Sequence, residues 1–365
     1  MKKNVIIFMP SIEDGGVEKN LYEVSNYLVK NNISLEIITC NKNMSFKFSK
    51  DIKFIGTKNS YWNNRSRYIK YIICLLILFL TLIKRKEKTL VFAFQANIYA
   101  VILAKILNVK IITRSNSAPP GWSQNAIKNF IYKFFIKFAN DVMVNSFEFK
   151  KIFEKKFNIK VKCIYNPFNK NFVLKKIKIK KKITFFKKGY LNIISVGRLT
   201  DQKDHLTLLR SIKELDSNFK VKVIIIGKGS TKDILKRYII KNNLQNKIKL
   251  FGYTNNPFPF IQKANIVVLT SKFEGLPNIL LEAQFLRKYI ISTNCPTGPK
   301  EILLNSKAGD LINIGDFKKL SHLIKNYSNN KNSIIKKINT GYKKFYRFDY
   351  MLNCKKYLNF IKNNY

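Results

Sequence analysis

Acidic side chains are scarce in this 365-residue sequence, which has 21 Asp and Glu against 68 Lys and Arg and a formal net charge of +47. A surface this basic should attract anionic partners, such as nucleic acid or an acidic membrane face. The lysines are spread along the whole chain, however, so general over-use of Lys, Asn and Ile explains the charge equally well. A nucleic-acid-binding protein would gather basic and aromatic residues in one patch, and the diffuse lysines fit that class poorly.

Histidine and clustered cysteine are also lacking. The chain has two histidines, His205 and His322, and five widely scattered cysteines without a Cys-x-x-Cys pair. A disulfide framework, a zinc site and a Cys-His nucleophile are therefore unsupported, and we expect no metal site. The apolar run at residues 4–10 is short and no small-residue cleavage site follows it, so we interpret it as a buried strand and expect a cytoplasmic protein.

Short apolar runs alternate with segments of helical spacing in both halves of the chain. Strands are expected at 5–9, 34–39, 89–94, 110–113 and 141–145, and later at 191–196, 221–226, 248–251, 266–271 and 289–293. Helices are expected at 17–30, 96–107 and 126–139, and from His205 and Lys232. This alternation predicts an α/β protein with parallel sheets covered on both faces. We expect an N-terminal domain at 1–170, a basic linker at 171–188 and a C-terminal domain at 189–345.

The most hydrophobic segment runs from Tyr71 to Ile83 and is flanked by Arg65, Arg67 and Lys70 before it and by basic residues 84–86 after it. As a helix it would be about 20 Å long, short of the roughly 30 Å needed to cross a bilayer. Because it is apolar all round, two interpretations stay open: a buried crossover helix, or a helix lying in a membrane face.

Cationic and glycine-containing motifs follow the strands of the C-terminal half. Arg198 and Lys203 come just after the 191–196 strand, where their charges could converge on a diphosphate, or could equally be two solvated cations. Gly197 and Gly227 lie at strand ends, where ligands of parallel sheets bind and where glycine lets a ligand approach the backbone. Tyr253 follows a third strand, and the sequence fits a core position for it as well as a ligand-binding position.

Two acids flank a turn in the segment Phe273-Glu274-Gly275-Leu276-Pro277-Asn278, which leads to Glu282. Pro277 suits the first turn of a helix, and the backbone N–H groups there favour an anion. Glu274 and Glu282 would then flank the same site, where carboxylates accept hydrogen bonds from vicinal hydroxyls. On spacing alone, an exposed helix acid and a loop acid explain the pair equally well.

Together these motifs resemble the retaining glycosyltransferases of family 4, which have the two-domain GT-B architecture. The resemblance continues in Cys295-Pro-Thr-Gly298-Pro299-Lys-Glu301, in the first-domain loop Gly15-Gly16-Val17-Glu18, and in Asn166-Pro167. It implies two Rossmann-like parallel-sheet domains facing across a cleft. The segment 346–365 looks like the terminal helix that crosses back to the first domain.

The resemblance also implies roles for individual residues. Arg198 and Lys203 would hold the donor diphosphate, Glu274 the donor hexose and Glu282 the ribose. The remaining donor contacts implied are Gly16, Gly197, Gly227, Tyr253, Leu276, Pro277, Asn278 and Ile279. No metal and no cofactor would be required, since cations and a helix N-terminus do the electrostatic work.

The sequence departs from the family in its first domain. Members often carry a histidine there, whereas both histidines of this chain lie in the second half; Gln95 and Asn97 are only weak substitutes. The expected activity is transfer of a hexose or N-acetylhexosamine from a nucleotide sugar to a lipid-linked or growing saccharide in bacterial surface-glycan synthesis (O-antigen, capsule or lipopolysaccharide). UDP is expected as the donor nucleotide rather than GDP, because it is the more frequent one in the family. The expected location is peripheral, on an anionic inner-membrane surface, with no nucleic acid as partner. A sugar-nucleotide epimerase or hydrolase on the same fold is the alternative.

Overall fold

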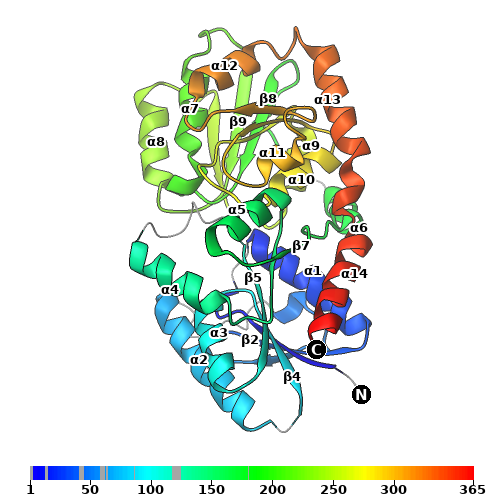
Figure 1. Ribbon diagram of the computed structural model, residues 1–365. Coiled ribbons are helices and arrows are strands. Elements are labelled where there is room, and N and C mark those ends of the chain that lie inside the picture. Colours follow the sequence, from blue (N-terminus) through cyan, green and yellow to red (C-terminus); the bar gives the residue numbers. More distant parts are fainter. Residues whose placement is uncertain are drawn as a thin grey trace. The chain divides into compact units, whose positions relative to one another are not determined.

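The computed structural model describes residues 3–12, 15–40, 45–57, 62, 65–85, 87–116, 125–179 and 181–365. The chain divides into two compact units (Figure 1). The first consists of Met1–Pro167 with Tyr350–Tyr365, and the second is Phe168–Asp349. The C-terminal helix α14 (Tyr350–Asn364) thus belongs to the first unit and packs beside α1 (Gly16–Lys30), whereas residues 346–349 of the expected terminal segment belong to the second.

A seven-stranded sheet in the order β3-β2-β1-β4-β5-β6-β7 forms the centre of the first unit. All its strand pairs are parallel. The strands are β1 (Lys3–Phe8), β2 (Ile33–Ile38), β3 (Lys53–Ile55), β4 (Thr89–Ala93), β5 (Lys110–Arg114), β6 (Asp141–Val144) and β7 (Lys162–Cys163). The other helices are η1 (Ser45–Lys47), α2 (Arg67–Ile83), α3 (Asn97–Ile106), α4 (Ala126–Ile136) and α5 (Phe147–Phe157).

Alternate side chains of these strands enter different cores, because successive residues of a strand point to opposite faces. Val5 and Ile7 of β1 pack in a cluster with residues of α1 and α14. Ile6 and Phe8 pack in another cluster with residues of α2 and α3. The sheet is therefore covered on both faces, as the apolar strand sequences predict.

A six-stranded parallel sheet in the order β10-β9-β8-β11-β12-β13 forms the centre of the second unit. Its strands are β8 (Leu191–Val196), β9 (Val221–Ile226), β10 (Ile248–Gly252), β11 (Ile266–Leu269), β12 (Tyr289–Thr293) and β13 (Asp310–Ile312). Its helices are α6 (Lys170–Ile177), η4 (Asp201–Lys203), α7 (His205–Lys213), α8 (Lys232–Lys241), α9 (Phe258–Lys263), α10 (Asn278–Phe285), α11 (Pro299–Ile302), α12 (Phe317–Lys325), α13 (Lys331–Lys343) and η5 (Phe345–Phe348).

Two expectations need correction. The basic segment 171–188 is not simply a linker, because it begins within helix α6, whose N-terminal Asn169 side chain accepts from Phe172 N and whose Val173 is fully buried; its Lys180 lies outside the described residues. The segment 71–83 is neither wholly buried nor exposed. Within α2, the side chains of Lys70, Cys74, Leu78 and Leu82 are buried, while several others face outward. None of the described helices is both long and apolar enough to cross a membrane.

Candidate active site

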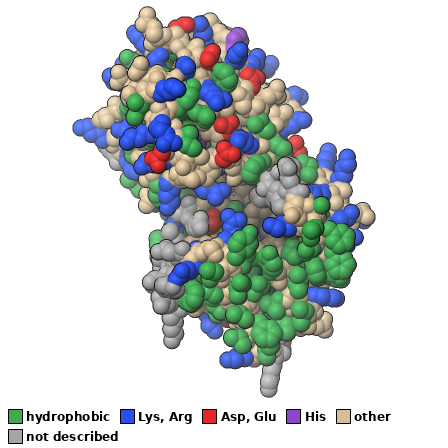
Figure 2. Space-filling view, turned by 90° about the vertical axis from the view of Figure 1, so that its left-hand side faces the viewer, with side chains coloured by type: hydrophobic (Ala, Val, Ile, Leu, Met, Phe, Trp, Pro, Cys, Tyr) green, Lys and Arg blue, Asp and Glu red, His purple; other side chains and the backbone are tan. Residues whose placement is uncertain are grey.

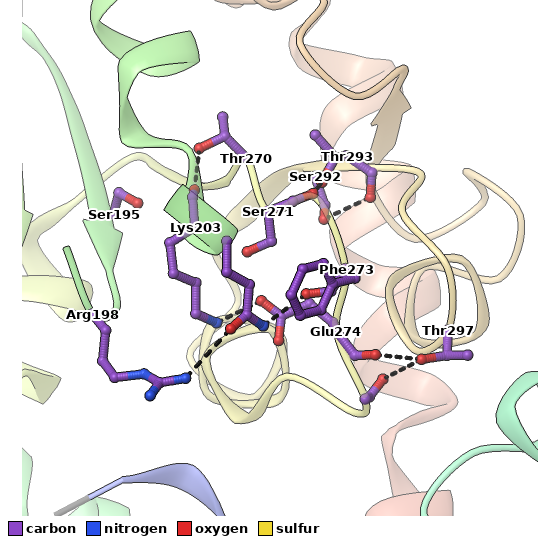
Figure 3. A network of polar contacts seen from close by, with 12 residues as sticks. Ser195, Arg198, Lys203, Thr270, Ser271, Phe273, Glu274, Ser292, Thr293 and Thr297 are labelled. Carbon is purple, nitrogen blue, oxygen red and sulfur yellow. Dashed lines mark hydrogen bonds and ion pairs between the residues drawn. The ribbon is translucent and has the colours of Figure 1, made fainter. Parts of the chain in front are cut away.

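The candidate site lies on the loops that follow β8, β9, β11 and β12. Because parallel strands end at the same edge of a sheet, these loops meet there, as the motifs predict. Figure 3 shows the Lys203 side chain directed at Glu274, with Arg198 extended beside it. The structure thus brings together the three residues expected to act on the donor.

Lys203 and Glu274 form an ion pair between segments that are 71 residues apart in the sequence. Lys203 Nζ lies 2.5 Å from Glu274 Oε1, and the two side chains are only 14% and 8% exposed. The Thr270 hydroxyl, just after β11, donates to the Lys203 backbone oxygen at 3.0 Å and fixes the end of η4. A cation and a carboxylate so largely withdrawn from water need each other, because either charge alone would be costly there.

Gln202 connects Arg198 to the loop that carries Glu274. Its amide oxygen accepts a hydrogen bond from Arg198 Nη2 at 3.3 Å, and its amide nitrogen donates to the Phe273 oxygen at 2.9 Å. The Gln202 backbone oxygen also accepts from Lys272 N at 2.8 Å. The Arg198 side chain is exposed, so its planar guanidinium is held beside the ion pair with donors directed at solvent.

His205 lies behind this cluster and is 3% exposed. Its Nε2 lies 3.3 Å from the Arg198 backbone oxygen, which can only accept, so Nε2 carries the proton and Nδ1 accepts from the Ser195 hydroxyl at 3.3 Å. Burial, followed by the Lys203 charge, lowers the pKa of His205 to about 4. The imidazole is therefore neutral at pH 7 and holds the backbone of the Arg198 loop.

Two glycines allow the loops of this site to pack closely. A Cβ on Gly227 would lie 1.8 Å from the Gly197 oxygen, and one on Gly298 would lie 1.9 Å from the Gly275 oxygen. Gly298 also has a φ of +81°, which side-chain-bearing residues rarely adopt. The space expected above Gly227 for a ligand is thus filled by the neighbouring loop, and its N–H donates to the Gly252 oxygen at 2.9 Å.

The Glu274 loop is held from the side of β12. The Thr297 hydroxyl donates to the Glu274 oxygen at 2.6 Å, and Glu274 N donates to the Pro296 oxygen at 3.4 Å. Burial and the nearby Glu274 charge raise the pKa of Cys295 to about 12, so this thiol stays protonated. It is a packing residue of the site and lacks the thiolate that a nucleophile needs.

Helix α10 begins one residue later than expected, because Pro277 has an extended ψ of 113° and serves as the N-cap. The start of the helix is buried: Leu276, just before it, is 5% exposed, and Ile279 and Glu282 within it are 8% and 7% exposed. The alternative of an exposed helix acid is therefore wrong for Glu282. Both carboxylates of the motif are withdrawn from water, a position that requires polar partners.

Other expected residues have different surroundings. Tyr253 is not in the core: it is 45% exposed, and Lys228 Nζ lies 5.1 Å from its ring centroid. Gly16 belongs to the first unit, where it begins α1. Next to it, a Cβ on Gly15 would lie 2.6 Å from Glu18 Oε2, so the Glu18 side chain folds back over the loop.

The polar residues at the strand ends of the first unit mainly hold backbone. Gln95 Oε1 accepts from Ser11 N at 3.1 Å, and Asn97 Nδ2 donates to the Arg114 oxygen at 3.0 Å. Arg114, the last residue of β5, also has a structural role. It is 1% exposed and donates to Tyr357 of α14 and to Asn166, at 2.9 Å each.

Three further residues position the expected site residues but were not predicted to do so from the sequence: Gln202, His205 and Thr297. Their positions inside or next to recognised motifs were the only available signal. Among the described residues, no group of three or more His, Cys, Asp or Glu is arranged to hold a metal ion.

Comparison with known proteins supports the interpretation of these motifs. Residues 176–344 match the family model described as glycosyl transferases group 1. An uncharacterized glycosyltransferase of Methanocaldococcus jannaschii is 39% identical over 178 residues, which is 47% of this chain and 44% of that protein. An N-acetylgalactosamine-N,N'-diacetylbacillosaminyl-diphospho-undecaprenol 4-alpha-N-acetylgalactosaminyltransferase of Campylobacter jejuni is 25% identical over 339 residues, or 84% of this chain and 85% of that protein.

The whole fold also has solved counterparts. The structure of Anabaena HepE in complex with UDP-glucose superimposes with a TM-score of 0.81 at 16% identity, covering 99% of each chain. This likeness confirms the expected GT-B architecture of two parallel-sheet domains. Over residues 176–344, which include the site loops, the chain is similar to the glycosyl transferases of group 1.

Proposed function

We propose that the protein is a retaining, metal-independent glycosyltransferase of family 4, which transfers a hexose or N-acetylhexosamine from UDP to a lipid-linked or growing saccharide of a bacterial surface glycan. The name of the C. jejuni relative supports the lipid-linked acceptor, since the acceptor that it gives for that enzyme is a sugar carried by diphospho-undecaprenol. The UDP-glucose bound to HepE supports the donor class. Such an acceptor would bring the protein to the inner face of the plasma membrane.

The observation that carries the proposal is the Lys203–Glu274 ion pair beside the exposed Arg198. A nucleoside diphosphate brings a concentrated negative charge, which Arg meets with a planar fork and Lys with a point charge. Without donor, Glu274 neutralises Lys203. With donor bound, Lys203 turns toward the diphosphate, and Glu274 accepts hydrogen bonds from hydroxyls of the sugar.

The same groups would stabilise the transition state. As the bond between the sugar C1 and the UDP oxygen breaks, negative charge grows on the departing phosphate. Arg198, Lys203 and the N-terminus of α10 meet that charge in a partly dehydrated site, where fixed donors and cations act strongly. For retention, the acceptor oxygen forms its bond to C1 on the face that UDP leaves, and the departing phosphate oxygen takes the acceptor proton.

The remaining contacts follow from position. Glu282, buried on α10, would accept from the ribose hydroxyls, and the backbone from Leu276 to Ile279 would meet the phosphates. Gly197 lies against the stem of Lys203, since a Cβ there would be 3.5 Å from two of its carbons and 3.6 Å from a third. The family resemblance also implies a donor contact for Gly16, and that role stays a prediction.

The test is incubation of the purified chain with labelled UDP- and GDP-sugars and a bacterial membrane lipid extract. We expect label in the lipid fraction with one UDP-sugar. Glu274→Gln should lower the rate by about 10²–10³, the loss typical of one key electrostatic contact. Glu214→Gln makes the same change on an exposed acid of the same unit and should leave the rate unchanged.

Two results would overturn the proposal. One is the absence of transfer from every donor, together with nucleotide-sugar binding that Glu274→Gln leaves intact. The other is release of free sugar, or its epimerisation, at a rate that the lipid extract does not affect. That second result would identify a hydrolase or epimerase on the same fold.

A further inference from the structure

Helix α2 exposes an apolar face that the fold does not use. Its outward residues recur every three or four positions, which places them on one side of a helix. They are Ile69, Ile72, Leu76, Leu80 and Ile83, which are 37%, 60%, 57%, 55% and 57% exposed. The opposite side of α2 already packs against the sheet through Cys74, Leu78 and Leu82. The outer face therefore remains in water at a cost, with no gain for the core.

Helix α4 exposes a second apolar face of the same kind. Its outward residues are Ile127, Phe130, Ile131 and Phe134, continued by Phe138 just after the helix, and they are 70%, 70%, 42%, 53% and 40% exposed. Helix α3 contacts both α2 and α4 and adds Tyr99 and Ile106, which are 49% and 72% exposed. Figure 2 shows hydrophobic side chains gathered over this side of the first unit, where α2 and α4 lie. We call it the α2–α4 face.

The charges around the α2–α4 face have one sign. Exposed basic residues surround or interrupt it: Arg65, Arg67, Lys84, Lys105, Lys128, Lys133 and Lys137. The segments 65–85, 97–107 and 125–140, which form the face, contain no Asp or Glu. Acidic residues are present elsewhere in the same unit, for instance Asp51 and Glu87, so the lack of acids distinguishes these segments.

We propose that the α2–α4 face docks onto an anionic lipid bilayer, with its aromatic and aliphatic side chains in the headgroup–acyl boundary and its lysines and arginines on lipid phosphates. Soluble monomers rarely expose apolar patches of this extent. Apolar helix faces with basic flanks bind bilayers in the interface plane without crossing them. A second copy of the chain would bring an identical basic rim against the first, so charge favours the bilayer.

The inference deepens the proposed function and rests on it only for the expectation that a membrane carries the acceptor. For residues 71–83, it combines the two interpretations left open by the sequence: one side of α2 is buried and the other lies in the membrane face. It also adds α4 to the membrane-binding surface. The in-plane arrangement explains why α2 is apolar all round, since one side meets the sheet and the other meets lipid.

Liposome flotation of the full chain tests the docking. The vesicles contain phosphatidylethanolamine and phosphatidylglycerol, or phosphatidylcholine alone. We compare wild type with Phe130→Ser/Phe134→Ser and with Phe46→Ser/Phe147→Ser. The control phenylalanines are 75% and 53% exposed, against 70% and 53% for the α4 pair, and lie outside the face. Since all four side chains are exposed, the variants should keep the wild-type melting temperature.

On anionic vesicles we expect the partition coefficient of Phe130→Ser/Phe134→Ser to fall about 100-fold or more, because this variant lacks two aromatic side chains that would be buried in the lipid. The control variant should float as wild type does. Lys128→Gln/Lys133→Gln should lose roughly fivefold per charge, and only at low salt on anionic vesicles.

Equal flotation of the two phenylalanine variants would overturn the docking, as would a lack of wild-type flotation on anionic vesicles. A dimer in sedimentation that Phe130→Ser/Phe134→Ser disperses would assign the face to a second copy. Transfer to a detergent-soluble acceptor separates the two proposals. If transfer persists without flotation, only the docking fails, and if flotation persists without transfer, only the transferase fails.

Discussion

Variants of the Lys203–Glu274 ion pair can distinguish a role in stability from a role in donor binding. The two side chains are 14% and 8% exposed, so Lys203→Met leaves a carboxylate nearly buried without its cation. Breaking a buried pair costs roughly 3–5 kcal/mol, and the residual exposure favours the lower end, about 3 kcal/mol. For a unit of roughly 150–250 residues, each kcal/mol lowers the melting temperature by about 2–4 °C, so a fall of about 6–12 °C is expected.

The double variant Lys203→Met/Glu274→Leu should recover most of this loss. Replacing both charges by apolar groups removes the unpaired carboxylate, and such replacements are often close to neutral. Donor recognition should not recover, because neither the cation for the diphosphate nor the carboxylate for the sugar remains. We therefore expect this variant to regain stability without regaining donor binding.

Differential scanning fluorimetry with and without UDP-sugar measures both quantities. A donor at about 100 times its dissociation constant stabilises the wild type by about 2.7 kcal/mol, which should raise the melting temperature by about 5–11 °C. The double variant should melt near the unliganded wild type and show no donor-induced rise.

A matched control is available in the same unit. Lys337 Nζ lies 2.5 Å from Asp310 Oδ1, with side chains 24% and 18% exposed. Lys337→Met should lower the melting temperature by a comparable or smaller amount and keep the full donor-induced rise. A donor-induced rise in Lys203→Met/Glu274→Leu would refute the reasoning, because the pair would then be a purely structural contact.

Three further predictions concern residues that support the sites. The pKa of His205 is lowered from its ordinary value of 6.5 to about 4, so its stabilising effect is complete above pH 6.5 and is lost as the pH falls to 4. Urea unfolding should show about 3 kcal/mol of pH-dependent stability over that range, which His205→Gln removes. Gly298→Ala should abolish donor binding, because its Cβ would lie 1.9 Å from a backbone oxygen of the Glu274 loop; Gly315→Ala has a similar φ of +78° with open space around it and should cost only about 1–2 kcal/mol, with donor binding by calorimetry intact. Tyr357→Phe leaves Arg114 without one acceptor and should destabilise the first unit by about 1.5–3 kcal/mol, detectable as faster proteolysis of α14.

The central strands could be predicted from the sequence because they are buried on both faces and hence apolar throughout. The strands β8, β9 and β12 begin and end where the apolar runs do. The edge strands β3, β7 and β13 have two or three residues and include Lys53, Lys162 and Asp310, so no apolar run marks them. Helix α6 has one fully buried side chain, Val173, among lysines, and its sequence therefore resembles a linker.

The motif residues could be predicted at the site, but their partners could not. The spacing within Phe273–Glu282 marks a loop and helix, yet it carries no information that Glu274 meets a lysine 71 residues earlier. The partner of Gly227 could not be predicted either. A glycine at a strand end predicts a close approach, while only the tertiary structure shows that the approaching group is the Gly197 carbonyl.

Three of the few acidic side chains of this chain are buried. Among the described residues, the carboxylates with less than a tenth of their surface exposed are Glu18, Glu274 and Glu282, each 7% exposed. Burying a carboxylate costs free energy. With 21 acids and 68 bases in the chain, every acid could instead lie at the surface near a lysine or arginine. All three instead lie in the loop and helix motifs that the family resemblance singles out. General lysine over-use is compatible with the basic surface, but it does not explain why these acids are buried. The burial of Glu274 and Glu282 agrees with the proposed site, in which these two carboxylates accept hydrogen bonds from sugar hydroxyls.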